Sequence, residues 1–236
     1  MRQFNASDLK QYFNNHPAEI GKIVDFDKET DTYLTFDFTE RNKTLSSETI
    51  AKTNLFTDWV SDQLKNTNSR YGIGGYNEHR TIYARSVLFN ADTQLRRLHL
   101  GVDIWGPALT PVYNPVGGRV HSFNFNDHFG DYGATIILEH KLAEIKFYSL
   151  FGHLSLASLN NLTEGKYVPK GEHFTEFGIP AENGHWPPHL HYQLMFDMEG
   201  MRGDYPGVCA FSEREKFLDN CPDPKDILAQ TFSKFV

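Results

Sequence analysis

The stretch PPHLHYQ, residues 187–193, is the most informative part of the chain because it places two histidines on one face of an expected strand. Side chains alternate between the faces of a strand, and each residue adds about 3.3 Å, so His189 and His191 would lie about 6.6 Å apart on one face. Neutral imidazole is a common zinc ligand, and a second imidazole beside a metal can hold or move a proton. Taken alone, however, the pair is explained better by two hydrogen-bonded or solvated histidines than by a metal site.

The region around this stretch, residues 82–198, has the pattern of short strands separated by Gly, Pro and Asn turns. The expected strands are residues 82–89, 112–113, 119–126, 134–140, 147–153 and 189–196. We therefore expect a mainly β fold, α+β overall, with a compact antiparallel β-sheet or barrel-sandwich core.

The N-terminal part of the chain has a different pattern. Residues 22–26 and 33–38 alternate apolar and polar side chains, which predicts a strand pair. A helix is expected from about residue 47 to residue 65, begun by Ser46 or Ser47. The glycine-rich stretch YGIGGY, residues 71–76, resembles a phosphate-binding loop only superficially, because a helix rather than a strand precedes it. The expected organisation is an N-terminal extension (1–80), a β domain (81–200) and a C-terminal packing segment with a short helix begun by Pro224 (201–236).

Composition excludes several classes of protein. At 236 residues, with 39% hydrophobic and 22% charged side chains, the chain has enough apolar surface to fold, as one domain or as a core with an appendage. A net charge of -7 argues against nucleic acid and anionic membranes as partners. No apolar segment has the length of a signal peptide or a membrane span, so a cytoplasmic location is expected, or an extracytoplasmic one if an export signal has been removed. Cys209 and Cys221 have neither redox nor zinc-knuckle spacing and are expected to be reduced thiols.

Two further stretches carry residues that could join the same site. HLGVD, residues 99–103, would place His99 and Asp103 about 13 Å apart on a straight strand, which is too far for both to bind one ion. A bend at Gly101 would let both reach a metal. FGHLS, residues 151–155, presents His153 beside a glycine at the end of an expected strand.

These motifs, His99-x-x-x-Asp103, the lone His153 and His189-x-His191, resemble in that order those of the lysostaphin/LytM-type zinc metallopeptidases, a family of peptidoglycan endopeptidases. The resemblance covers about residues 95–198. Supporting stretches lie at residues 110–113, 117–120, 132–140, 165–171 and 177–178. The whole chain is also similar to an unexported peptidase-like domain that is fused to aminotransferases in some bacterial proteins.

The resemblance implies that His99, Asp103 and His191 bind one zinc ion, while His153 and His189 are catalytic. Two imidazoles and a carboxylate leave an open fourth position, which is typical of a catalytic site. The chain has no H-E-x-x-H, so histidines would have to assist zinc-activated water. The implied reaction is hydrolysis of an amide bond in a peptide or muropeptide, such as a peptidoglycan stem peptide or crosslink. Gln193 stands where family members often have Glu; it should share the face of the two histidines, where it could hydrogen-bond without adding charge.

Three alternatives remain open. The first is a non-catalytic, metal-containing module that binds a peptide or glycopeptide in a larger assembly. The second is an unrelated metal-dependent enzyme on a similar core. The third, a cupin-like site, is disfavoured because it expects a carboxylate a few residues after H-x-H, whereas Glu199 is eight residues away. Trp105 and Trp186 could line a groove near the site, although packing is the commoner role of such residues.

Overall fold

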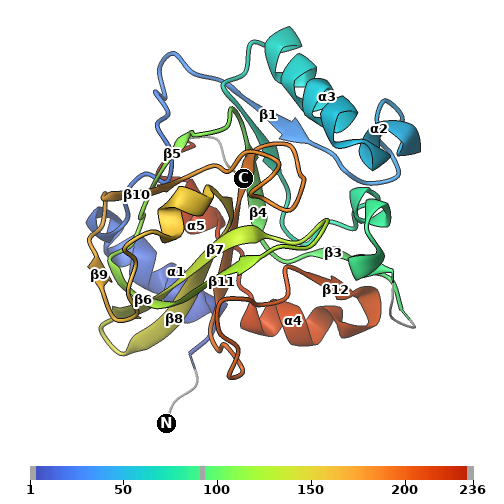
Figure 1. Cartoon of the computed structure of the whole chain (residues 1–236). Coiled ribbons are helices and arrows are strands. Elements are labelled where there is room, and N and C mark those ends of the chain that lie inside the picture. The colour runs from blue at the N-terminus through green and yellow to red at the C-terminus, as the bar shows by residue number, and fades with distance from the viewer. Residues whose placement is uncertain (1–3, 91–93, 233–236) are drawn as a thin grey trace.

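Figure 1 shows the computed structural model of the chain, which describes residues 4–90 and 94–232. Its centre is an eight-stranded sheet with two edges, so the sheet is open rather than a closed barrel. The strand order is β1 (Tyr33–Phe36), β2 (Tyr71–Gly74), β4 (Val102–Trp105), β11 (His189–Met195), β8 (Ile145–Leu154), β7 (Gly133–Leu142), β6 (Gly118–Asn126) and β9 (Tyr167–Val168). All neighbouring strands are antiparallel except β1 and β2. The expected strand-rich fold with a large antiparallel sheet is therefore confirmed.

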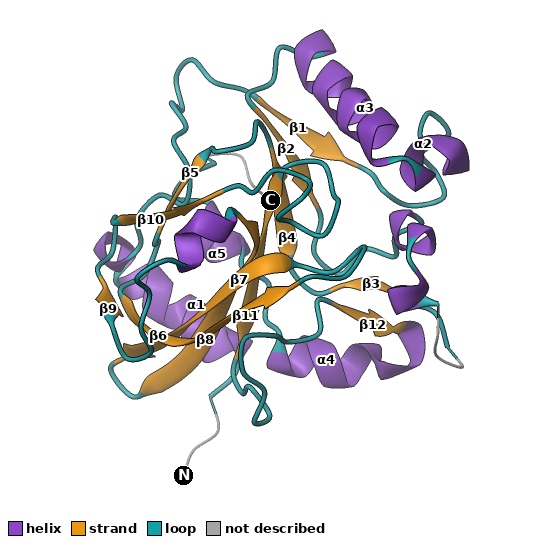
Figure 2. Ribbon diagram, in the orientation of Figure 1, coloured by secondary structure: helices purple, strands orange, loops and turns teal. Residues whose placement is uncertain are grey.

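Two small sheets and five helices complete the described fold (Figure 2). The small sheets pair β5 (Pro111–Tyr113) with β10 (His173–Glu176), and β3 (Arg96–His99) with β12 (Val208–Ala210). The α-helices are α1 (Ala6–Asn15), α2 (Ser47–Ala51), α3 (Thr53–Asn66), α4 (Arg214–Asn220) and α5 (Lys225–Leu228). Single 3₁₀ turns lie at Pro17–Glu19, Ile82–Arg85, Val87–Phe89, Leu156–Leu159 and Phe211–Glu213. None of the helices described is long and apolar enough to span a membrane.

The central position of β11 follows from its composition and neighbours. All seven of its residues are buried, and its backbone pairs with β4 on one edge and with β8 on the other. Strands covered on both faces are rich in apolar side chains, and a polar side chain there needs a hydrogen-bond partner. His189, His191 and Gln193 are therefore placed where polar residues are costly unless they are paired.

Two sequence-based expectations, one in the extension and one at the start of the β domain, are wrong. Residues 22–26 form no strand, and β1 pairs instead with β2, in parallel and after an intervening helical segment. The strand expected at residues 82–89 is replaced by two 3₁₀ turns. The Ser86 side chain accepts a hydrogen bond from the backbone N–H of Leu88, and this local bond competes with an extended conformation.

The helix expected at residues 47–65 is present as two helices, α2 and α3. Ser46 begins α2, and its hydroxyl accepts a hydrogen bond from the Thr49 N–H. Lys52 has extended backbone (φ -110°, ψ 115°) and ends α2 where α3 begins. In the C-terminal part, Pro224 immediately precedes α5, as expected. Since β1 and β2 belong to the main sheet, the first 80 residues are joined to the β core by backbone pairing.

Candidate metal centre

The three predicted metal ligands lie on adjacent elements and are all buried. His99 is the last residue of β3, Asp103 lies on β4 and His191 lies on β11. Asp103 and His191 are direct partners in the β4–β11 register. The chain turns from β3 into β4 at Leu100 and Gly101, so His99 faces the pair rather than lying far along one strand.

The spacing of the donor atoms fits one small ion. His99 Nε2 lies 3.2 Å from Asp103 Oδ1, His191 Nδ1 lies 3.0 Å from the same oxygen, and the two nitrogens are 3.0 Å apart. Ligands about 2.0 Å from a tetrahedral zinc ion are about 3.3 Å from one another. The three atoms thus form a triangle close to one face of a zinc tetrahedron, and the donor set of two imidazoles and one carboxylate suits zinc.

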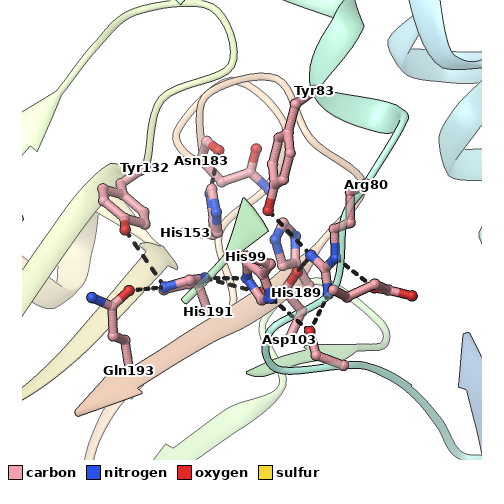
Figure 3. Close-up of polar contacts among 12 residues, drawn as sticks. Arg80, Tyr83, His99, Asp103, Tyr132, His153, Asn183, His189, His191 and Gln193 are labelled. Atoms are coloured by element: carbon pink, nitrogen blue, oxygen red, sulfur yellow. Dashed lines mark hydrogen bonds and ion pairs between the residues drawn. The ribbon is translucent and has the colours of Figure 1, made fainter. Parts of the chain in front are cut away.

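A hydrogen bond on the outer side of each of the two imidazole rings leaves the other ring nitrogen facing the Asp103 carboxylate, and Figure 3 shows the one between His191 and Gln193. His99 Nδ1 lies 2.9 Å from the Gly75 carbonyl oxygen, which can only accept, so Nδ1 carries the proton and Nε2 has a free lone pair. His191 Nε2 donates to Gln193 Oε1 at 3.0 Å, which leaves Nδ1 free. The Gln193 amide nitrogen donates to the Pro206 carbonyl at 3.1 Å, and this bond sets the orientation of the amide. Such outer partners orient metal-binding imidazoles.

The Asp103 carboxylate has a cationic partner that the sequence did not reveal. Arg80 Nη1 donates to Asp103 Oδ2 at 2.5 Å, and both side chains are buried. Burial by itself would raise the pKa of Asp103, but His99 and Arg80 outweigh it and hold that pKa well below its usual value. Burial, with Arg80 nearby, lowers the pKa of His99 to about 3. At neutral pH the centre therefore presents a carboxylate and a neutral imidazole, the forms that bind metal.

The two predicted catalytic histidines lie beside this centre, and each is anchored through Nδ1. His153 Nδ1 donates to the Asn183 carbonyl at 2.9 Å, and His189 Nδ1 donates to the Pro187 carbonyl at 2.7 Å. Their ring centroids are 4.1 Å apart, so both Nε2 atoms belong to one small region. His153 has a positive φ of 62°, which is uncommon outside glycine and turns its side chain away from the regular course of β8.

Both histidines are neutral. Burial lowers the pKa of His189 to about 4 and the pKa of His153 well below its usual value. The His189 ring stacks on Trp105, with centroids 3.8 Å apart and planes 11° apart. The histidines therefore present unprotonated Nε2 atoms that could accept a proton.

A cavity of about 250 Å³ opens onto the metal centre and the histidine pair. The two tryptophans expected near a groove, Trp105 and Trp186, both line it. Tyr132, the two 3₁₀ turns at residues 82–89, the loop before β12 and Val208 at the start of β12 supply most of the rest of its apolar wall. Its charged lining includes Asp131 and Asp204, whose pKa values are raised by burial.

Two further histidines and the two cysteines have structural roles. His140 is buried between the Gly117 carbonyl and the Ser149 hydroxyl, on β7, outside the cavity lining. His185 stacks on Phe129, and its carbonyl accepts a hydrogen bond from Thr53. Cys209 and Cys221 are buried free thiols. The residues that sequence reasoning missed are Gly75, Glu78, Arg80 and Tyr83; the glycine-rich stretch at 71–76 was the one signal near them.

The fold and the centre together define a strand-rich chain with a buried histidine–carboxylate site of metal-binding type. Residues 97–202, a little under half of the chain, match the model of peptidase family M23. All three predicted ligands and both predicted catalytic histidines fall within it. No curated protein matches the chain.

Several solved structures resemble part of the chain. The catalytic domain of lysostaphin from Staphylococcus simulans is 20% identical, with 68% of this chain and 96% of that domain covered and a TM-score of 0.41. Whole lysostaphin is 24% identical over 58% of this chain and 46% of its own, with a TM-score of 0.38. A zinc-containing peptidase from Vibrio cholerae is 23% identical over 42% and 27%, with a TM-score of 0.34. The chain thus spans less than half the length of two of these three proteins.

Proposed function

We propose that the protein is a zinc-dependent metalloendopeptidase that hydrolyses an amide bond in a peptide, with a peptidoglycan stem peptide or crosslink as the substrate class. The observation that carries the proposal is the triangle of His99 Nε2, Asp103 Oδ1 and His191 Nδ1, whose sides measure 3.0 to 3.2 Å. The match of residues 97–202 to peptidase family M23 supports a peptidase rather than another metalloprotein. The likeness to the domain fused to bacterial aminotransferases stays a prediction.

His99, Asp103 and His191 would hold the ion. A zinc ion held there would act as a Lewis acid. It would lower the pKa of a bound water towards neutrality and polarise the scissile carbonyl. With only three ligands from the protein, the ion would remain able to bind water or substrate.

His153 and His189 would handle protons and developing charge. Each has an unprotonated Nε2 in the neutral form and an Nδ1–H held by a carbonyl, so either could accept a proton from water at Nε2. Once protonated, the same nitrogen could donate a hydrogen bond to the carbonyl oxygen as it gains negative charge, or return the proton to the departing amine. The stack on Trp105 and the bond to the Pro187 carbonyl limit rotation of the His189 ring, which keeps Nε2 directed to one place.

Two variants separate metal binding from chemistry. His99→Ala should abolish stoichiometric zinc binding, because it removes one corner of the triangle. His189→Ala should keep bound zinc and lose at least about 100-fold in turnover, since general acid–base catalysis contributes on the order of 10² to 10⁴. Metal content of the purified protein and cleavage of a panel of peptides and muropeptides provide the two measurements.

His173→Ala is the matched control, because His173 is an exposed histidine on β10, away from the cavity lining. It should change neither measurement. Full activity in metal-free protein would refute the zinc mechanism. Stoichiometric zinc without cleavage of any member of the panel would favour the alternative, a metal-containing module that binds a peptide or glycopeptide.

A further inference from the structure

Two of the three metal ligands are held from outside by a segment that precedes the M23-matching residues. The Gly75 carbonyl accepts from His99 Nδ1, and Arg80 donates to Asp103. Both come from the chain between β2 and the 3₁₀ turn at Ile82–Arg85, outside residues 97–202. The centre is therefore built from two parts of the sequence, only one of which carries the recognisable motifs.

The Arg80 guanidinium is buried and held on three sides. Its Nε donates to Glu78 Oε2 at 2.7 Å, its Nη2 to the Gly75 carbonyl at 3.2 Å and its Nη1 to Asp103 Oδ2 at 2.5 Å. Glu78 is fixed in turn, because its Oε1 accepts from the Phe38 N–H at 3.1 Å. A guanidinium is a planar fork, so bonds on its other edges determine where Nη1 points.

The glycine-rich strand β2 makes room for this arrangement. Gly74 is the register partner of Asp103, and a Cβ on Gly74 would lie 2.6 Å from Arg80 Nη2 and 3.3 Å from Trp105 Nε1. The first distance is shorter than side chains tolerate, so any other residue at this position would displace the guanidinium. The stretch at residues 71–76 thus has a structural role at the metal centre, not at a phosphate.

We propose that Arg80 is a positioning residue of the metal centre, which holds Asp103 by Oδ2 so that Oδ1 is presented to the ion. The inference rests on the proposed function in one respect, that the centre binds zinc. Glu78 balances the charge of Arg80, so the pair orients the carboxylate without adding net charge near the metal. Without the guanidinium, the Asp103 carboxylate is free to turn about its terminal bond, and its oxygen leaves the triangle.

The test compares zinc affinity in wild type, Arg80→Met and Arg80→Lys, by competition with a chromophoric chelator. Loss of an outer partner of a metal ligand typically costs about 10- to 100-fold in affinity, which is the loss expected for Arg80→Met. Arg80→Lys keeps the charge but has no fork with which to bridge Glu78 and Asp103, so an intermediate loss is expected. The visible absorption spectrum of the cobalt-substituted protein should also change in both variants, because it reports ligand geometry directly.

Arg85→Met is the matched control. Arg85 packs over Phe129 and Trp186 and donates to Thr53, so this variant removes a guanidinium without touching a metal ligand. Its zinc affinity should stay within about two-fold of wild type. The inference would be overturned if Arg80→Met bound zinc as tightly as the wild type and gave an unchanged cobalt spectrum. If Arg80→Met does not fold, the same two results for Arg80→Lys would overturn it. Absence of zinc binding in the wild type would instead refute the proposed function.

Discussion

Gly101→Ala is expected to weaken zinc binding although the side chain it adds is only a methyl group. Gly101 lies in the turn between β3 and β4, and a Cβ there would lie 2.7 Å from His191 Cε1, 2.8 Å from His191 Nε2 and 2.7 Å from the Tyr192 carbonyl oxygen. Ordinary contacts begin at 3.4 Å, so the shortest approach falls 0.7 Å short (3.4 - 2.7).

The His191 ring cannot give way without cost. Its backbone is paired with Asp103 on one side and Gly152 on the other, so relief must come from tilting the ring or shifting the turn. Metal–ligand distances tolerate only about 0.2 Å. A displacement of about 0.7 Å at the ring therefore breaks the fit of Nδ1 to the triangle, and we expect zinc affinity to fall by at least about 100-fold.

Chelator competition measures this loss, and urea unfolding of the metal-free protein measures the accompanying strain. Overpacking of this kind typically lowers the free energy of unfolding by about 1–3 kcal/mol. Gly75→Ala is the control: it adds the same methyl near the same site, but the nearest atom to its Cβ, the Glu78 Cβ, is 3.9 Å away. Equal zinc affinities for Gly101→Ala and Gly75→Ala would show that the close approach to His191 does not govern the site.

Three further predictions concern Gln193, the buried His140 and the effect of zinc on stability. Gln193→Glu replaces the amide that donates to Pro206 by a carboxylate oxygen facing a carbonyl, and should lower the unfolding free energy by about 1–3 kcal/mol; an unchanged urea midpoint would contradict this. Burial lowers the pKa of His140 to about 4 in the folded protein, whereas in the unfolded chain it is near 6.5. Between these two pH values the unfolded chain binds a proton that the folded protein does not, so the free energy of unfolding falls as the pH drops from 6.5 towards 4. His140→Gln should therefore reduce the slope of stability against pH by up to about 1.4 kcal/mol per pH unit in that window, measured by denaturant titrations across it; an identical slope argues against a neutral His140. Zinc at 100 times its dissociation constant should stabilise the wild type by about 2.7 kcal/mol, seen as a higher melting temperature, and should not stabilise His99→Ala. A zinc-induced rise of equal size in both proteins would mean that the ion binds elsewhere.

The strands that carry the site were largely predictable. The apolar runs and turn residues of β6, β7, β8 and β11 place those strands within a residue or two of their observed bounds. The failures lie where the local pattern is ambiguous. Residues 82–89 have strand-like composition, but a serine hydroxyl bonded to the backbone and several buried aromatic contacts favour 3₁₀ turns. Residues 22–26 alternate as a strand would, yet they form no strand, and β1 pairs with β2 alone at the edge of the sheet.

The bend between His99 and Asp103 was also predictable, because a straight strand would separate them too far for one ion. The reason for glycine at position 101 differs in part from the one expected. The turn requires a close approach of the His191 ring, which a side chain on Gly101 would block. That requirement depends on β11, about 90 residues away along the chain, and no local pattern contains it.

Sequence alone indicated the chemistry available to the site: two imidazoles and a carboxylate that could bind zinc, and two more histidines that could move protons, in an order that resembles that of a known peptidase family. Tertiary structure alone decided which nitrogen of each ring faces inward and which residue orients the carboxylate. These choices rest on the Gly75 and Asn183 carbonyls, the Gln193 amide and the Arg80 guanidinium. The physical reason is that residue type and spacing show which groups can bind a metal or a proton, whereas hydrogen-bond partners are set by the register and packing of segments far apart in the chain.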